Sequence, residues 1–242
     1  MKFSLIVEAR TGSRRLPNKI LLKIKKKNFL EYLLIRLSKI KKIDNFIVAT
    51  STNKKDRKII QIAKKNNFKY FAGSEKNVLK RVIMASRKFS CENIIRITSD
   101  CPLIDVRIIQ KAMKLFENTN CDYLSNTIKR SYPDGMDVEI FKFSSLVKAS
   151  KYANSTTYKE WTTWSLIQNP KIFNIKQFLS EKKFFNPKLG LTLDYFEDYI
   201  FLKKIILFFG ENKIIRCDEI LKLLKNKKSW LKINNKVKRN II

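Results

Sequence analysis

The sequence predicts an α/β fold in three layers, with a mainly parallel, Rossmann-like sheet and helices on both faces. Its 242 residues suit one such domain with a continuous buried core. The composition, 44% hydrophobic and 12% aromatic, is that of a globular protein. The first half alternates short apolar runs with amphipathic segments, which is the pattern of repeated βα units around a parallel sheet.

Strands and helices are expected to alternate up to residue 120. Short apolar runs predict strands at 3–7, 46–49, 68–71 and 93–97. Apolar residues at helical spacing predict helices at 29–40, 56–65, 78–85 and 105–116. Asp105 stands where the last of these helices begins, and its carboxylate suits an N-cap.

The alternation is looser beyond residue 120. We expect a half-exposed strand at 137–141, helices at 144–152 and 158–168, a late strand at 189–193 and a helix at 197–208. The predicted organisation is a single domain over 1–225, with an inserted subregion near 125–185. Residues 226–242 form a basic C-terminal tail, and the lysine-dense stretch from Lys222 to Arg239 is expected to be solvated and frayed.

The sequence has no feature of a membrane or exported protein. Its longest apolar stretch, 199–209, is interrupted by Lys203 and Lys204 and is too short to span a bilayer, so we expect no membrane insertion. The amino terminus lacks an extended apolar region and a small-residue cleavage site, which predicts a cytoplasmic protein. The four cysteines lie far apart and are expected to be free thiols.

The absence of histidine restricts the chemistry. It excludes nucleophilic schemes that use a Ser-His or Cys-His pair. It also removes the commonest zinc ligand, so any metal must be held by carboxylates, which favours magnesium or manganese.

A formal charge of +31 suggests nucleic-acid binding as an alternative function. The lysines, however, recur on every predicted helix and in most loops instead of forming one stripe. The abundance of Lys, Asn and Ile together indicates AT-rich coding. We therefore expect no specific nucleic-acid partner.

A basic loop follows the first predicted strand, in the segment 8–19. Ligands of open α/β sheets bind just outside the carboxyl ends of the strands, where this loop lies. Backbone amides near Gly12 and Ser13 can form an anion nest, with Arg10, Arg14, Arg15 and Lys19 supplying positive charge. The glycine spacing fits neither the Walker A pattern nor the dinucleotide fingerprint. A solvated basic loop is the alternative interpretation of this segment taken alone.

Two aspartates follow predicted strands. Asp100 comes after the fourth strand, at the same edge of the sheet as the basic loop, and Asp194 follows the late strand. Two such carboxylates can hold magnesium on a substrate phosphate. Taken singly, each could equally be a helix cap or a turn former.

A set of motifs lies along the chain in a fixed order. Residues 9–19 read ARTGSRRLPNK, and further motifs occupy 49–53, 73–81, 96–105, 132–141 and 191–198. Together they resemble the spore coat polysaccharide biosynthesis protein F family, which belongs with the cytidylyltransferases that make CMP-ulosonates and CMP-sialic acids. The match extends from residue 1 to about residue 205.

This resemblance implies a nucleotide-diphospho-sugar transferase fold and a magnesium-dependent cytidylyltransferase. The implied reaction transfers CMP from CTP to an acidic sugar, with release of pyrophosphate, for surface polysaccharide biosynthesis. The resemblance assigns catalytic roles to Arg10, Lys19 and Asp100, and magnesium ligation to Asp100 and Asp194. The implied nucleotide-binding residues are Ala9, Arg10, Gly12, Ser13, Arg15, Lys19, Ala49, Thr50, Thr52 and Asp100. Those bordering the sugar are Tyr132, Asp134, Asp137 and Glu139, although Asp134 and Gly135 would equally make a plain turn.

Three departures from the family pattern stand out, of which the first bears on the nucleotide contacts and the second on the sugar side. Glu8 stands where relatives usually have Gln, and this chain has Lys159-Glu160-Trp161 where they commonly have Arg-Glu-His. The late motif, 194–198, lacks the usual proline. Transfer from another nucleotide, glycosyl transfer on the same fold and a non-catalytic nucleotide-binding homologue remain alternatives. The sugar and the oligomeric state stay open, a homodimer included.

Overall fold

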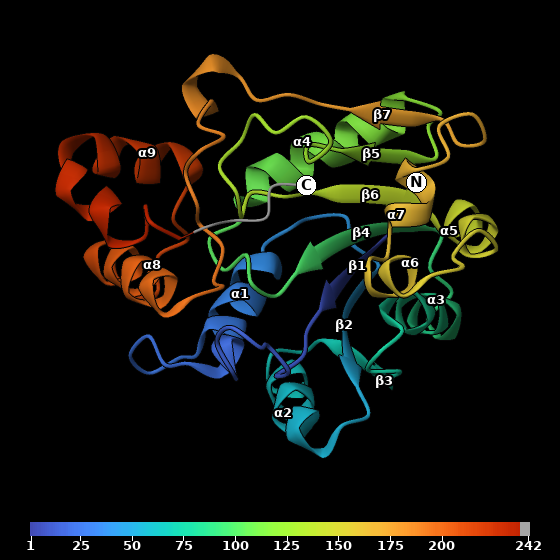
Figure 1. Cartoon of the computed structure of the whole chain (residues 1–242), viewed down its shortest axis with the longest axis horizontal. Helices are drawn as coiled ribbons and strands as arrows, with labels where there is room; N and C mark the ends of the chain where they lie inside the picture. Colours follow the sequence, from blue (N-terminus) through green and yellow to red (C-terminus); the bar gives the residue numbers. More distant parts are fainter. Residues whose placement is uncertain (238–242) are drawn as a thin grey trace.

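A computed structural model describes residues 1–237 of the chain and contains one seven-stranded sheet in the order β3-β2-β1-β4-β6-β5-β7 (Figure 1). Strand β1 pairs in parallel with β2 and β4, and β2 pairs in parallel with β3. Strand β6 is antiparallel to both β4 and β5. The strands are β1 (Phe3–Glu8), β2 (Asn45–Ser51), β3 (Lys69–Gly73), β4 (Asn93–Thr98), β5 (Tyr123–Ser125), β6 (Glu139–Lys142) and β7 (Ile175–Gln177). The mainly parallel sheet predicted from the sequence is confirmed.

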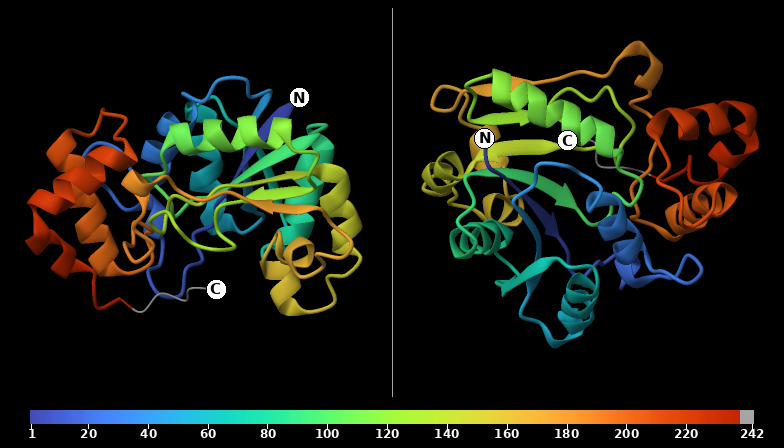
Figure 2. Two further views of the ribbon diagram at one scale, coloured as in Figure 1. Left: turned by 90° about the horizontal axis from the view of Figure 1, so that it is seen from above. Right: turned by 180° about the vertical axis from the view of Figure 1, so that it is seen from behind.

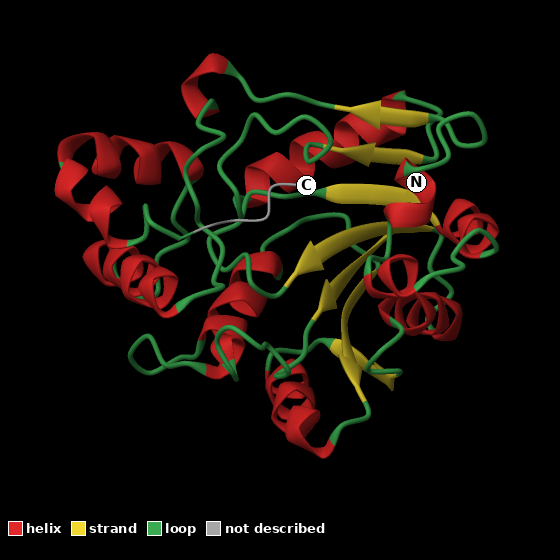
Figure 3. Ribbon diagram, in the orientation of Figure 1, coloured by secondary structure: helices red, strands yellow, loops and turns green. Residues whose placement is uncertain are grey.

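Helices cover both faces of this sheet, which gives three layers (Figures 2 and 3). Strand β1 is buried on both sides, with Leu5 and Val7 in one core and Ile6 in the other. The first core packs against α1 (Phe29–Leu37), α2 (Arg57–Lys65), α4 (Val106–Asn118), α8 (Phe196–Phe209) and α9 (Cys217–Asn226). The second packs against α3 (Val78–Lys88), α5 (Phe143–Ser150) and α7 (Trp164–Ile167), with α6 (Thr156–Glu160) nearby. Short 3-10 turns are η1 (Lys19–Leu21), η2 (Lys54–Asp56), η3 (Lys182–Phe184) and η4 (Lys228–Ile233).

Polar side chains cap several of these helices, α1, α3 and α4 among them. Asn28 accepts a hydrogen bond of 2.8 Å from the Glu31 amide, and Asn77 accepts one from the Lys80 amide. Asp105 accepts one of 2.9 Å from the Arg107 amide at the start of α4. The N-cap predicted for Asp105 is confirmed.

The predicted late strand at 189–193 is wrong. The alternating leucines of this segment are buried, but it forms only one isolated bridge, between Asp134 and Gly190. Its other backbone bonds include one from the Leu193 amide to the Asp100 carbonyl. The segment is therefore extended and held by loops rather than by a neighbouring strand.

The predicted helix at 158–168 is also wrong as a single element. It is divided into α6 and α7, with Thr162 and Thr163 in the interruption. Their hydroxyls donate hydrogen bonds to Glu8 and Glu139 on the sheet. These tertiary bonds, together with the low helix propensity of threonine, favour a break at this point.

The expected frayed tail is wrong for the described part of the C-terminal stretch. The turn η4 packs on α8, where Trp230 meets Phe208 with ring centroids 5.8 Å apart. Asn234 is buried and donates a hydrogen bond of 2.8 Å to Asp198. Aromatic packing and a buried amide hold this basic segment against the domain. The last five residues of the predicted tail, 238–242, lie outside the described residues.

Two further expectations can be compared with the structure. All four cysteines are free and buried, as predicted. Within residues 1–237, no helix combines the length and apolar character needed to cross a membrane.

Candidate active site

The basic loop begins where β1 leaves the sheet beside β2 and β4. The Ala9 amide donates a hydrogen bond of 3.1 Å to the Ala49 carbonyl, and the Ser99 amide donates one of 3.0 Å to the Glu8 carbonyl. Three strand ends therefore meet here, at the carboxyl edge of the parallel strands. This is the edge at which open α/β sheets bind their ligands.

A buried carboxylate fixes the shape of the loop. Asp56, only 2% exposed, accepts hydrogen bonds from the Thr11 amide at 2.8 Å and the Thr11 hydroxyl at 2.6 Å. It also accepts one from the Ser51 hydroxyl. The Thr11 carbonyl in turn accepts from the amides of Ser13 and Asn18. Sequence reasoning placed Asp56 only at a helix start and missed this anchoring role, because Thr11, the loop residue that it holds, is 45 residues away in the chain.

The loop presents its cations outward. Arg10, Arg14 and Arg15 are exposed, as is Gly12. A Cβ atom built on Gly12 would meet only Glu75 Oε1, at 3.5 Å, which is an ordinary contact. The fold itself therefore tolerates a side chain at Gly12, so any requirement for glycine there would come from a ligand.

Lys19 links the loop to the two aspartates. Its ammonium lies 2.8 Å from Asp100 Oδ2 and 3.0 Å from Asp194 Oδ1, and Arg15 Nη2 lies 2.7 Å from Asp194 Oδ1. Burial alone would raise the pKa of Asp100, but the Lys19 ammonium lowers it to about 2. Asp100 is therefore ionised at neutral pH.

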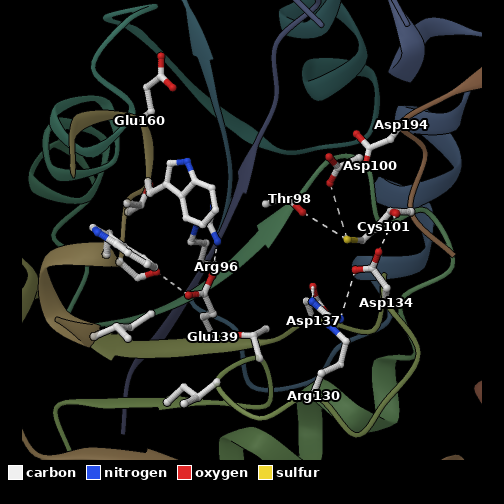
Figure 4. Close-up of a pocket in the computed structure, with 18 of the residues that line it drawn as sticks. Arg96, Thr98, Asp100, Cys101, Arg130, Asp134, Asp137, Glu139, Glu160 and Asp194 are labelled. Atoms are coloured by element: carbon white, nitrogen blue, oxygen red, sulfur yellow. Dashed lines mark hydrogen bonds and ion pairs between the residues drawn. The ribbon is translucent and has the colours of Figure 1, made fainter. Parts of the chain in front are cut away.

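The structure thus brings Asp100 and Asp194 together, as the sequence predicted (Figure 4). Lys19 lies between them and contacts both. Asp194 reaches this position from an extended loop and not from the predicted strand end. Magnesium ligation by the two carboxylates stays a prediction.

A cavity of about 590 Å³ opens next to this cluster. Asp100 and Asp194 line one end (Figure 4), and Arg15, which also lines the cavity, contacts Asp194. The lining continues over β4, the loop between β5 and β6, β6 itself and the segment from α6 to α7, where its charged and aromatic members are Arg96, Arg130, Asp134, Asp137, Glu139, Glu160, Trp161 and Trp164. A single cavity therefore joins the aspartate pair to a second, polar region.

Arg130 pairs with two carboxylates in this region. Its guanidinium donates to both oxygens of Asp137, at 2.7 and 3.1 Å, and lies 3.2 Å from Asp134 Oδ1. Burial raises the pKa of Asp137 to about 6, against the lowering effect of Arg130, and the charges of Asp134 and Glu139 add to the rise. Asp134, Asp137 and Glu139 together thus carry more negative charge than the Arg130 guanidinium balances.

Arg96 pairs with two further carboxylates at the cavity floor. Its Nε and Nη2 donate to Glu8 at 2.9 and 2.8 Å, and its Nη1 contacts Glu139. Glu139 also accepts from the hydroxyls of Tyr123 and Thr163. Burial would raise the pKa of Glu139, but Arg96 and these hydroxyls lower it. Glu8, which stands where relatives usually have Gln, thus forms a structural ion pair with Arg96.

Comparison with known proteins identifies the family. Residues 4–227 match the cytidylyltransferase family. The chain belongs to this family. The uncharacterized protein MJ1063 of Methanocaldococcus jannaschii is 37% identical over 199 residues, which cover 82% of this chain and 81% of that protein.

Two further relatives match most of the chain. Spore coat polysaccharide biosynthesis protein SpsF of Bacillus subtilis is 28% identical over 224 residues, or 90% of this chain and 92% of that protein. The solved structure of a cytidylyltransferase from Leptospira borgpetersenii serovar Hardjo-bovis has a TM-score of 0.90 and 30% identity, covering 99% of this chain and 100% of that one. The family and the fold predicted from the sequence are confirmed.

At the second strand end of this cytidylyltransferase, only part of the predicted nucleotide contact is accessible. Ala49 and Thr50 are fully buried, and only Thr52 is exposed. Ala49 already uses its carbonyl to bind Ala9. An exposed side chain at this strand end is therefore available only from Thr52 among the three predicted residues, and the nucleotide-binding roles of Ala49 and Thr50 stay predictions.

Tyr132 was predicted to border the sugar, and this is wrong. Its ring is 1% exposed and packs against Phe178 and Phe184, each with ring centroids 6.1 Å away. The neighbouring turn is a structural requirement: Gly135 has φ of +97°, and a Cβ atom there would come within 2.8 Å of the Leu191 backbone. The apolar ring belongs to the core, while Asp134 and Asp137 on either side of the turn face the cavity.

Sequence reasoning gave no role to several residues of the cytidylyltransferase site. Arg96 and Arg130, both half-buried, form its two ion-paired clusters. Arg81 is a buried cation whose Nη1 donates to the Ser74 carbonyl at 2.7 Å. Burial lowers the pKa of Arg81, and so does the charge of Arg10. The sequence signal that could have identified Arg96 as a site residue is its position as a charged residue inside an otherwise apolar strand.

Proposed function

We propose that this cytidylyltransferase transfers CMP from CTP to a sugar hydroxyl, releasing pyrophosphate, with magnesium as its cofactor. The observation that carries the proposal is the contact of Lys19, on the basic loop, with both Asp100 and Asp194. A triphosphate bound on that loop would meet two carboxylates able to hold a divalent cation on its oxygens.

The loop supplies the means to bind the triphosphate. Arg10, Arg15 and Lys19 would form charge-assisted hydrogen bonds with phosphate oxygens, and the backbone at Gly12 and Ser13 would approach them closely. The loop is held in place by Asp56, so little ordering is needed on binding.

The residues of the aspartate pair fit a magnesium ion. Magnesium is usually bound by one or two carboxylates together with substrate phosphates and water. Asp100 is ionised, and the pair already shares the Lys19 cation. No cluster of three or more acidic or cysteine side chains suited to a metal occurs in residues 1–237, so phosphate oxygens and water would complete the shell. The ion would polarise the α-phosphate.

Catalysis would then consist of positioning and charge neutralisation. The sugar oxygen would form a bond to the α-phosphorus while the bond to the leaving pyrophosphate breaks, and the hydroxyl proton would pass to water. Lys19 and Arg15 lie where they would neutralise the charge that develops on the phosphates. The chain contains no histidine, so no histidine base takes part.

The acceptor would occupy the cavity that shares Asp100 and Asp194 with the phosphate site. The name of the SpsF relative, a spore coat polysaccharide biosynthesis protein, supports a sugar destined for a surface polysaccharide. The acidic character of that sugar is a prediction that rests on the family resemblance.

Pyrophosphate release tests the proposal. The protein is incubated with CTP, UTP, GTP or ATP, with magnesium or a chelator, and with a panel of acidic, neutral and amino sugars. We expect release only with CTP, magnesium and a sugar together. Release that continues without a sugar, or with every nucleotide alike, would contradict the assignment.

A further inference from the structure

We propose that α8 and the turn η4 form a face that binds the surface of a membrane containing anionic lipids. The apolar residues of this α8–η4 face are Phe196, Ile200, Leu207, Phe208 and Leu231, all exposed. Figure 1 shows α8 and α9 together at one end of the molecule, and η4 packs on both. Binding would be peripheral and independent of the proposed cytidylyltransferase function.

Helix α8 is apolar on its outer side as well as on its inner side. Inner residues such as Phe201 and Ile205 are buried in the first core. On the outer side, Phe196, Ile200 and Leu207 follow one another at spacings of four and seven residues, so they form one stripe about 16 Å long. Phe196 is 58% exposed. Because the outer side of a surface helix is normally polar, this stripe indicates a binding surface.

Aromatic packing joins the stripe to η4. Phe208, which is 55% exposed, meets Trp230 edge to face, with ring centroids 5.8 Å apart. The Lys204 ammonium lies 4.7 Å from the centroid of the Trp230 ring. Leu231, the next residue along η4, is exposed as well. The two elements therefore present a continuous apolar and aromatic surface that includes a lysine.

The chain around η4 carries positive charge only. Residues 220–237 contain no acidic residue, and their lysines are all exposed, namely Lys222, Lys225, Lys227, Lys228, Lys232 and Lys236. The acidic residues just before this stretch already have partners. Asp218 pairs with Arg107, and Glu219 lies 2.8 Å from the Lys213 ammonium. The charge of the stretch is therefore available to an external anion.

A groove beside η4 combines apolar and cationic walls. It has a volume of about 370 Å³ and lies between η3, α9 and η4. Phe185, Leu221 and Leu231 contribute apolar surface, and Lys225 and Lys228 contribute charge. No acidic residue of the described chain lines it. This combination fits the headgroup and upper acyl chain of an anionic lipid.

A membrane surface accounts for both the apolar and the basic side chains of the face. Phe, Trp and Leu side chains enter the boundary between headgroups and acyl chains, while lysines contact anionic headgroups. A second copy of the chain would bring a like charge of +31 towards these lysines. A nucleic acid would neutralise the lysines but would leave Ile200 and Leu207 exposed, because aliphatic side chains offer no stacking surface to bases.

Co-sedimentation with vesicles tests the inference. The whole protein is mixed, at physiological ionic strength, with vesicles of phosphatidylcholine alone or of phosphatidylcholine with phosphatidylglycerol. We expect binding to the phosphatidylglycerol vesicles to be at least about tenfold tighter than to the neutral ones. Equal binding to both, or binding to neither, would overturn the inference. Retention by single-stranded DNA without retention by vesicles would assign the lysines to nucleic acid and would overturn it too.

A pair of apolar substitutions separates the face from the bulk charge of the protein. Ile200→Gln with Leu207→Gln should weaken binding to phosphatidylglycerol vesicles by about tenfold. Met84→Gln with Ile172→Gln is the matched control, since it removes two exposed apolar side chains from α3 and from the loop between α7 and β7. Its effect should stay below about twofold. Equal effects of the two pairs would refute the role of the stripe.

A pair of lysine substitutions tests the basic part of the face in the same assay. Lys225→Gln with Lys228→Gln should weaken binding by about ten- to thirtyfold. Lys58→Gln with Lys80→Gln removes two exposed lysines from α2 and α3, so both variants have the same net charge. The control should lose much less binding, because its lysines lie outside the face. Equal losses would show that net charge drives binding, and the inference would fall.

Discussion

The backbone amide of Leu193 donates a hydrogen bond of 2.8 Å to the carbonyl of Asp100. This bond holds the extended segment against the end of β4, so that Asp194, the next residue, lies beside Asp100. Asp198 supports the same arrangement by accepting hydrogen bonds from the amides of Asp194 and Tyr195. Asn234 in turn donates to Asp198, so the C-terminal segment supports the aspartate pair from behind.

Removal of the Asp100 charge should abolish most turnover. Asp100→Asn keeps the size of the side chain and one ligand oxygen, but it weakens both magnesium binding and the contact with Lys19. We expect pyrophosphate release to fall by about a hundredfold or more. Folding should survive, because Asp194 remains as a partner of Lys19. Near-normal release from a folded Asp100→Asn protein would refute the assignment of this residue.

Asp105 offers a contrasting substitution. Its carboxylate is 2% exposed and binds Arg107 and the Cys217 amide as well as capping α4. Asp105→Asn should therefore lower the free energy of unfolding by about 1–3 kcal/mol, measured by urea denaturation. Release per folded molecule should remain close to that of the native protein, since Asp105 does not line the cavity. An Asp105→Asn protein that is stable but inactive would contradict the roles given to Asp105 and Asp100.

Lys19→Ala should weaken the binding of CTP. The loss of a charge-assisted contact with phosphate costs about 1.5–3 kcal/mol, or about ten- to a hundredfold in the Kd measured by calorimetry. Lys25→Ala is the matched control, because Lys25 is an exposed lysine a few residues further along the chain. Unaltered CTP binding by Lys19→Ala would count against the whole phosphate site.

The sequence predicted the parts of the site that are local. The basic loop and Asp100 directly follow buried parallel strands, β1 and β4, and the ends of such strands meet at one edge. The order of apolar and polar residues along the chain therefore suffices to place both.

The remaining parts depend on contacts between distant segments. Glu8, Arg96 and Glu139 form one cluster from three strands, and Thr162 reaches it from the interruption between α6 and α7. The apolar alternation around Leu191 is equally typical of a strand and of a buried extended loop, so it could not distinguish them. The charge of the cavity likewise follows from which side chains meet there, which composition does not reveal.

Asp137 should make stability depend on pH in an unusual direction. Its pKa is raised to about 6 in the folded protein, from about 3.9 in an unfolded chain. The folded state therefore binds the Asp137 proton more tightly than the unfolded state does. This contribution to stability is fully present below about pH 4 and is lost as the pH rises through about 6. Asp137→Asn removes the titration and keeps a polar partner for Arg130. Urea denaturation between pH 4 and 7 should show the native protein losing stability relative to Asp137→Asn as the pH rises. A constant difference between the two proteins across this range would show that the pKa of Asp137 is the same in the folded and unfolded states, which would contradict the raised pKa.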